Sequence, residues 1–344
     1  MIRALAWVND RLVVADDKGL SEYKCPEMKP HGFESLTQSQ RIYAGSQIIS
    51  LSATESFLAA VNCDGSLCLF ELTDDNPLRE LGRSTRASEA LYLACFLHRR
   101  GGRLVVTAGL QSKLSLHSLN RSSNVLTLQQ EVKVNGLVSA FASSHSGRFV
   151  GFGTTSGKVG VCRLDDSTGA LGDLEFSSYT HEGAIKSVCF ARGAKSEDLL
   201  ISVCEKGEMI VWVIGGDARS ISRETSFCMS QGGQILLTAD WRGHANISKV
   251  SKLEDSFGLE QVHRRKFHMQ LLNGGISASG FVAVAGLGEV IAWMPEVADD
   301  IKSEEQTELG VATPMETKED HMQVANLIED EDLDDTARLL YGGL

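Results

Sequence analysis

The chain has 344 residues, of which 42% are hydrophobic, so it can bury a sizeable core as one large domain. We expect neither a membrane span nor a secretory leader, because no run of 18 apolar residues exists and the first ten residues lack a signal pattern. The net charge is −12, and residues 297–344 alone, with 14 Asp or Glu and 3 Lys or Arg, account for −11. That imbalance marks them as a segment separate from residues 1–296.

Short apolar runs rich in Val and Ile follow one another along the chain, separated by turn residues, and they predict strands rather than helices. The first group consists of runs at 2–8, 11–15 and 20–25. Similar groups of about three strands cover 48–72, 91–119, 137–164, 184–215, 225–250 with an outer strand at 262–268, and 271–294. The clearest group is 184–215, in which a turn at Glu205-Lys206-Gly207 separates the second run from the third.

One turn position recurs with a period near 45 residues. Its occupants are Gly19, Gly65, Ser112, Gly157, Gly207, Gly243 and Gly288. Four or five residues later come Tyr23, Phe70, His117, Cys162, Trp212, Ser248 and Trp293. This period is typical of propellers, and seven units predict seven blades. Because the aromatic residues share one repeated inward position, we expect Tyr23, Phe70, Trp212 and Trp293 in the core rather than at a ligand.

His181-Glu182-Gly183 before one strand and Trp212 in the third resemble the Gly-His and Trp-Asp signals of the WD-repeat family. The resemblance covers residues 2–296 in period and strand pattern. It implies a rigid, non-catalytic platform that binds other proteins. The Trp-Asp dipeptide never appears whole, and the aspartate of the family's buried Asp-His-Ser/Thr-Trp network is not evident. No strand precedes residue 2 to complete the last blade, so we expect residues after Trp293 to complete it or the ring to stay incompletely closed.

Sequence patterns of catalytic, cofactor or metal sites do not stand out. The eight cysteines form no Cys-x-x-Cys pair and mostly lie in strand runs, which favours buried thiols in a reducing compartment. The glycines of Gly151-Phe152-Gly153 lie within a strand run and do not open a helix, as a phosphate loop must. No histidine forms a close pair with a carboxylate at ligand spacing on one strand. We therefore predict no catalytic residue, no metal, no cofactor and no small-molecule substrate.

Two segments carry alternative interpretations. Arg264, Arg265 and Lys266, beside Phe267, are either a solvated outer strand or an RNA-binding run in which the aromatic stacks on a base. In the C-terminal segment, Leu333, Ala337 and Leu340 share one face at helical spacing. The helical part either folds back on the propeller, stays disordered, or docks on a partner through this face.

The sequence thus predicts an all-β, seven-bladed propeller over 1–296, an acidic linker over 297–317 and a short helical tail over 318–344. The functional hypothesis is a non-catalytic scaffold subunit that binds other protein subunits in an intracellular complex, cytoplasmic or nuclear, with the tail as a docking segment. The alternative is an RNA- or ribonucleoprotein-associated propeller that uses residues 263–268. An enzyme is the third and weakest hypothesis.

Overall fold

The computed structural model describes residues 2–295, except for positions 9–10, 25–33, 36–37, 43–46, 55, 74–75, 85–90, 98–103, 121–124, 145, 166, 193–197, 215–217, 224–227, 233–234, 254–255, 278–280 and 287–288. All regular elements in this part of the chain are β-strands. A helix long and apolar enough to cross a membrane is absent from these described residues. The predicted linker and tail, 297–344, lie outside them.

The described strands form six sheets, five of four strands and one of eight. The first contains β1 (Ile2–Val8), β2 (Arg11–Asp16), β3 (Gly19–Lys24) and β5 (Gln38–Ile42). The eight-stranded sheet contains β6 (Ile48–Ala53), β7 (Phe57–Asn62), β8 (Leu67–Thr73), β9 (Asn76–Ser84), β10 (Leu91–Phe96), β11 (Leu104–Gly109), β12 (Lys113–Asn120) and β13 (Val125–Lys133). Its two halves join where β9 and β13 pair in parallel.

The remaining sheets follow in chain order. The third contains β14 (Val138–Ser143), β15 (Phe149–Thr154), β16 (Lys158–Leu164) and β17 (Leu171–Thr180). The fourth contains β18 (Ile185–Arg192), β19 (Asp198–Cys204), β20 (Glu208–Val213) and β21 (Ala218–Arg223). The fifth contains β22 (Cys228–Gly232), β23 (Ile235–Ala239), β24 (His244–Leu253) and β25 (Ser256–Lys266). The last contains β26 (Asn273–Ile276), β27 (Val282–Ala285), β28 (Val290–Trp293) and β4 (Glu34–Ser35).

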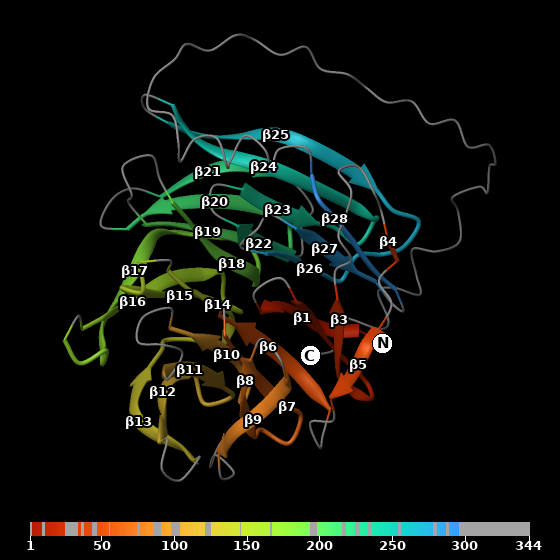
Figure 1. Ribbon diagram of the computed structural model, residues 1–344. Helices are drawn as coiled ribbons and strands as arrows, with labels where there is room; N and C mark the ends of the chain where they lie inside the picture. The colour runs from red at the N-terminus through yellow and green to blue at the C-terminus, as the bar shows by residue number, and fades with distance from the viewer. Residues whose placement is uncertain are drawn as a thin grey trace, which may run out of the picture. The chain divides into compact units, whose positions relative to one another are not determined.

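The sheets are arranged around a common centre. In residues 2–295, β1 contacts β6, and the contacts continue through β10, β14, β18, β22 and β26 back to β1. Figure 1 shows these strands on the inside and β9, β13, β17, β21 and β25 on the outside. This closed circuit of innermost strands is the arrangement of a β-propeller.

The last sheet is completed by a short strand from early in the chain. β4 pairs antiparallel with β28, Ser35 opposite Ile291 and Glu34 opposite Ala292. The expectation that residues after Trp293 supply this strand is therefore wrong. β4 lies between β3 and β5 in the sequence, so its backbone hydrogen bonds tie this early part of the chain to the last sheet.

The repeated turn residue has the conformation that its position requires. The backbone φ angles of Gly65, Gly157 and Gly207 are 78°, 81° and 79°, and each residue lies in the turn between the second and third strands of its group. The prediction of equivalent turns is confirmed for these three glycines. Ser112, with φ of 57°, is the non-glycine residue with positive φ in the described part of the chain. The same conformation at a serine supports its assignment to the repeat.

Apolar clusters fill the spaces between neighbouring sheets. Trp212 is 3% exposed and lies in a cluster with Ala140 and Val161 of the preceding sheet, which confirms the prediction that it is buried between neighbours. Phe70 and Trp293 lie in equivalent clusters, and Tyr23 packs half-buried against another. These side chains are core residues, as the repeated position predicts. Cys68, Cys95, Cys162 and Cys204 are free and buried, whereas Cys63 is free and exposed.

Candidate functional site

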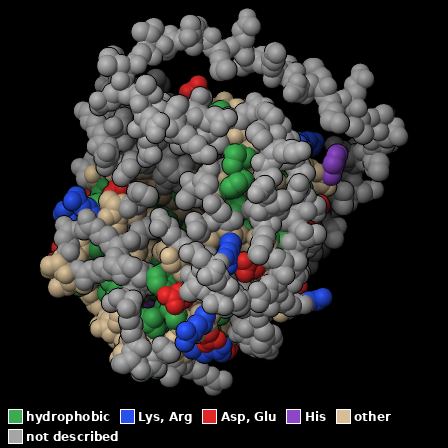
Figure 2. All heavy atoms as spheres, viewed as in Figure 1, with side chains coloured by type: hydrophobic (Ala, Val, Ile, Leu, Met, Phe, Trp, Pro, Cys, Tyr) green, Lys and Arg blue, Asp and Glu red, His purple; other side chains and the backbone are tan. Residues whose placement is uncertain are grey.

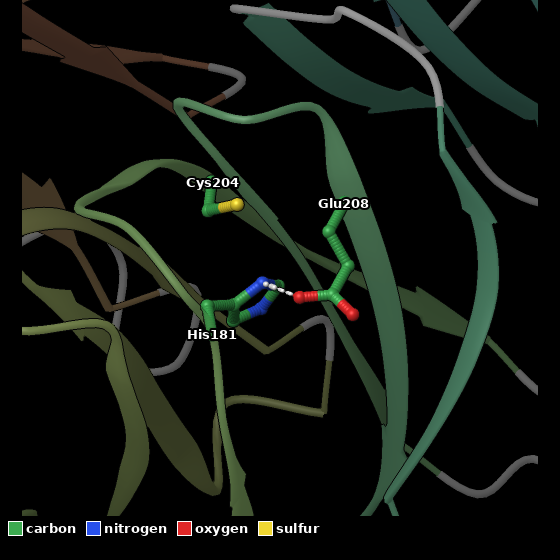
Figure 3. A group of neighbouring side chains, drawn as sticks. All are labelled: His181, Cys204 and Glu208. Carbon is green, nitrogen blue, oxygen red and sulfur yellow. Dashed lines mark ion pairs between the residues drawn. The ribbon is translucent and has the colours of Figure 1, made fainter.

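A group of buried polar side chains lies where the third sheet connects to the fourth. His181 follows β17 directly, Ser202 and Cys204 belong to β19, and Glu208 opens β20. Figure 3 shows the His181 ring and the Glu208 carboxylate pointing toward each other, with the Cys204 thiol beside them. His181 is 4% exposed, Cys204 0% and Glu208 7%. We call His181, Ser202, Cys204, Glu208 and the adjoining Tyr179 the junction cluster.

The backbone places His181 through a contact that recurs in the ring. Its N–H donates to the carbonyl of the turn residue Gly157 at 3.0 Å. Val134 donates in the same way to Ser112 at 2.7 Å, and Phe267 to Gly243 at 2.8 Å. Val134 and Phe267 are buried apolar residues, so this position ordinarily contributes to the core. At His181 the position holds an imidazole instead, which matches the histidine signal noted in the sequence.

Cys204 and Glu208 meet because of the hairpin between β19 and β20. Cys204 lies three residues before the turn glycine and Glu208 one residue after it. The side chains at the same two positions also meet in other sheets. Asn62 Nδ2 donates to Ser66 Oγ at 2.8 Å, and His244 Nδ1 lies 3.0 Å from Asp240 Oδ2. The hairpin therefore brings the two positions together, and the sequence places a thiol and a carboxylate there.

The cluster has one chain of polar contacts. His181 Nε2 and Ser202 Oγ are 2.8 Å apart, and the Tyr179 hydroxyl donates to Glu208 Oε1 at 2.6 Å. His181 Nδ1 lies 3.4 Å from Glu208 Oε2. Among the described residues neither of these last two atoms has a hydrogen-bond partner, although both are buried. Glu208 thus supplies the carboxylate beside the histidine that the sequence pattern left unassigned.

Burial sets the protonation of the histidine. Loss of water around the ring lowers the pKa of His181, and the nearby Glu208 carboxylate opposes that shift only in part. The imidazole is therefore neutral near pH 7, with Nε2 beside the Ser202 hydroxyl and Nδ1 beside the Glu208 carboxylate.

A simpler pair lies in the eight-stranded sheet. His117 Nε2 and Thr107 Oγ1 are 3.0 Å apart, and both residues are buried. Burial lowers the pKa of His117 to about 4, with Glu131 opposing the shift. His117 occupies the repeated inward position that holds Trp212 in the fourth sheet, so it is a core histidine with a hydroxyl partner.

The structure separates the predicted basic residues of β25. Arg264 and Lys266 are exposed, while Arg265 between them is half-buried, with its guanidinium carbon 6.0 Å from the Phe267 ring centre. Successive residues of a strand point to opposite faces, so Arg265 does not share the face of Arg264 and Lys266. Phe267 is 8% exposed and packs in the core, which removes it as a stacking surface for a base. Leu333, Ala337 and Leu340, the predicted docking residues of the tail, lie outside the described residues.

The sequence pattern did not predict that the residues of the junction cluster lie together. It indicates His181 as part of the repeat signal, but it contains no Cys-x-x-Cys pair and no close pair of a histidine and a carboxylate on one strand. His181 and Glu208 instead come from different elements, 27 positions apart in the sequence. The available signal was the turn itself, because a residue three before and a residue one after the turn glycine meet across the hairpin.

Two of the solved structures that are similar to this chain illustrate its fold. One is the Cps50 (Swd1) β-propeller domain of Myceliophteria thermophila, with a TM-score of 0.62, 14% sequence identity, and coverage of 85% of this chain and 96% of that one. The other is a chain of the mitotic checkpoint complex, with a TM-score of 0.63, 14% identity, and coverage of 85% and 88%. Neither a family model nor a curated protein matches the sequence. The chain therefore has the fold of WD-repeat β-propellers.

Proposed function

We propose that this protein is a non-catalytic scaffold subunit of an intracellular multiprotein complex, in the cytoplasm or the nucleus. The observation that carries the proposal is its fold, which it shares with a chain of the mitotic checkpoint complex. A propeller presents the turns at the ends of its strands to other molecules on a rigid frame.

The described part of the chain has the rigidity that such a frame needs. The innermost strands contact one another in a closed circuit, and apolar clusters fill the space between neighbouring sheets. Partners that bind a preformed surface lose less conformational entropy than partners that must order it. The scaffold proposal follows from this arrangement.

We also infer that the ring consists of seven blades. The eight-stranded sheet counts as two of them, because β9 and β13 pair only through Val125 with Arg83 and Leu126 with Ser84. Every other neighbouring pair within the two halves is antiparallel. Two blades joined by one short outer pairing account for the larger sheet.

The acidic tail is the proposed attachment segment. Its balance of −11 contrasts with the near-neutral remainder of the chain. Figure 2 shows basic and acidic side chains next to one another on the face viewed. Ion pairs such as Arg3–Asp17 at 2.9 Å and Lys113–Glu131 at 3.1 Å likewise place opposite charges next to each other on the surface. A predominantly acidic segment suits a partner with a basic surface.

Co-purification from cells tests the proposal. The tagged full chain is compared with a truncation after Met315 and with Leu333→Asp combined with Leu340→Asp. Arg338→Asp is the matched control, because it changes the charge by the same amount and lies off the predicted apolar face. We expect stoichiometric protein partners with the full chain and the control. We expect weaker capture with the truncation and the double variant, because Asp cannot be buried unpaired.

Different results separate the parts of the proposal. Full partner capture by the truncated chain would remove the tail as the attachment segment and leave the scaffold role intact. Recovery of the full chain without any stoichiometric protein would contradict the scaffold role itself. Capture that nuclease treatment abolishes would instead favour the RNA-associated alternative, which uses Arg264, Arg265 and Lys266.

A further inference from the structure

The turn between β23 and β24 holds an exposed cation against an aromatic ring. Trp241 and Arg242 occupy this turn, directly before the turn residue Gly243. The guanidinium carbon of Arg242 lies 5.1 Å from the centre of the Trp241 ring, and Arg242 is exposed while Trp241 is half-buried. Other turns hold Thr155 and Glu205 in the position of Trp241, so the turn does not require an aromatic residue. Nucleic-acid bases stack on aromatic rings and on guanidinium groups, and this pair offers both.

The end of β25 lies beside this turn. The Phe267 N–H donates to the carbonyl of Gly243 at 2.8 Å, which holds the two segments together. Arg264 and Lys266 are exposed and share one face of β25, about 7 Å apart along the strand. Figure 1 shows β25 on the outside of its sheet, next to β24. The turn and the strand therefore place the side chains of Arg242, Arg264 and Lys266 on one part of the surface.

Acidic side chains of the described residues do not neutralise these three cations. None of the three forms an ion pair within this part of the chain. Asp240, next to the turn, instead accepts from the His244 backbone N–H at 2.8 Å and faces its Nδ1 at 3.0 Å. Glu260 of β25 lies opposite Lys249, toward the other end of the strand. The positive charge at the turn is thus available to an anion, and residues 1–296 are close to neutral overall.

We propose that Trp241, Arg242, Arg264 and Lys266 bind a single-stranded nucleic acid. The cations of β25 contact phosphates of its backbone, and a base stacks against the pair formed by Trp241 and Arg242. Every base has a face that can stack, so the surface has little sequence preference. The bases of a duplex are already stacked on one another, so a duplex offers this surface its phosphates alone and binds less tightly.

This assignment changes the residues that the basic run of the sequence indicates. Arg265 is half-buried with its guanidinium near Phe267, and Phe267 packs in the core, so neither is available to a strand of RNA. Arg242 replaces the first as a cation, and Trp241 replaces the second as the aromatic residue. An acidic peptide would use the cations without the aromatic ring, so the contribution of Trp241 distinguishes the two kinds of ligand.

Binding of a fluorescein-labelled oligouridine RNA to the purified full chain, measured by fluorescence anisotropy, tests the proposal. The variants are Trp241→Ala, Arg242→Ala, and Arg264→Ala combined with Lys266→Ala. Circular dichroism verifies that each variant is folded. The assay contains only this protein and RNA, so its outcome is independent of the scaffold role.

Two controls accompany these variants. Arg148→Ala combined with Arg163→Ala removes two exposed cations from the third sheet, and it matches the double variant in charge. Trp241→Phe keeps an aromatic ring in the turn. Competition by oligoglutamate and by an RNA duplex separates an acidic peptide and a double-stranded ligand from the single strand.

We expect binding by the wild type and both controls, and an affinity lower by about fivefold or more in Trp241→Ala and Arg242→Ala. The double variant of β25 should bind more weakly and lose about 0.7 of the salt slope for each phosphate contact removed. Absence of binding by the wild type at low salt would overturn the proposal, as would an equal loss in the control that lacks Arg148 and Arg163. Unchanged affinity of Trp241→Ala, with oligoglutamate or duplex competing as well as the single strand, would show a general polyanion surface instead.

Discussion

Replacement of the turn glycine Gly157 tests how the backbone conformation of a turn affects the packing of neighbouring sheets. We expect Gly157→Ala to lower the free energy of unfolding by about 2–4 kcal/mol. A residue with a Cβ atom costs about 1–2 kcal/mol in the left-handed region, and the φ of Gly157 is 81°. The added Cβ would also lie 2.3 Å from the carbonyl oxygen of His181 and 3.0 Å from that of Gly183.

Both of these oxygens belong to the backbone, so no side-chain rotation relieves the contact. The loop must move, which weakens the hydrogen bond from His181 N–H to Gly157 at a further cost of about 1 kcal/mol. Urea unfolding followed by circular dichroism measures the change, provided the slope of the transition is unchanged. The opposite replacement, Ser112→Gly, relieves the same conformation and should stabilise the protein or leave it unchanged. Equal stability of Gly157→Ala and the wild type would refute the reasoning.

Three further predictions follow from the core and the charged strand. Trp212→Ala should lower the free energy of unfolding by about 3–5 kcal/mol, because a large side chain buried between sheets leaves a cavity, and a near-zero change in the urea midpoint would contradict its burial. Burial lowers the pKa of His117 from 6.5 to about 4, so the unfolded chain binds more protons than the folded one between these values. Stability should therefore fall by up to about 3 kcal/mol as the pH drops from 6.5 to 4, and urea midpoints across that range should show a shallower slope for His117→Phe than for the wild type. If β25 binds RNA, Ala at Arg264, Arg265 and Lys266 should weaken binding and flatten its salt dependence by up to about one unit per lost phosphate contact, whereas no binding by the intact protein at low salt would end that hypothesis.

The second strands of the groups, such as β7, β15 and β19, could be predicted from the sequence because nearly all of their residues are buried. β19, for example, reads as an apolar run from Leu199 to Val203, and its residues there are fully buried or nearly so. The turn glycines fixed the register between such runs, since each requires positive φ. Buried strands bounded by tight turns therefore leave a local signal that does not depend on their neighbours.

The outer strands and the junction cluster have no comparable local pattern in the sequence. β17 carries mostly exposed residues, so its sequence lacks the apolar run that marks an inner strand. β4 is two residues long, and its partner β28 lies near the other end of the described chain. The cluster depends on His181 reaching a hairpin of the next sheet. Contacts between residues distant in sequence have no local pattern, so only the assembled ring brings them together.

The pairing of β4 with β28 has a consequence for how the protein matures during synthesis. β3 and β5, on either side of β4, can pair as soon as the first sheet leaves the ribosome. β4 must wait until Ile291 and Ala292 have been made, tens of seconds later at about 5–20 residues per second. During that interval the nascent chain has an open row of sheets with unprotected flanks, which is the state that chaperones bind. Completion of the ring is thus a late event, set by the rate of translation rather than by the folding of any single sheet.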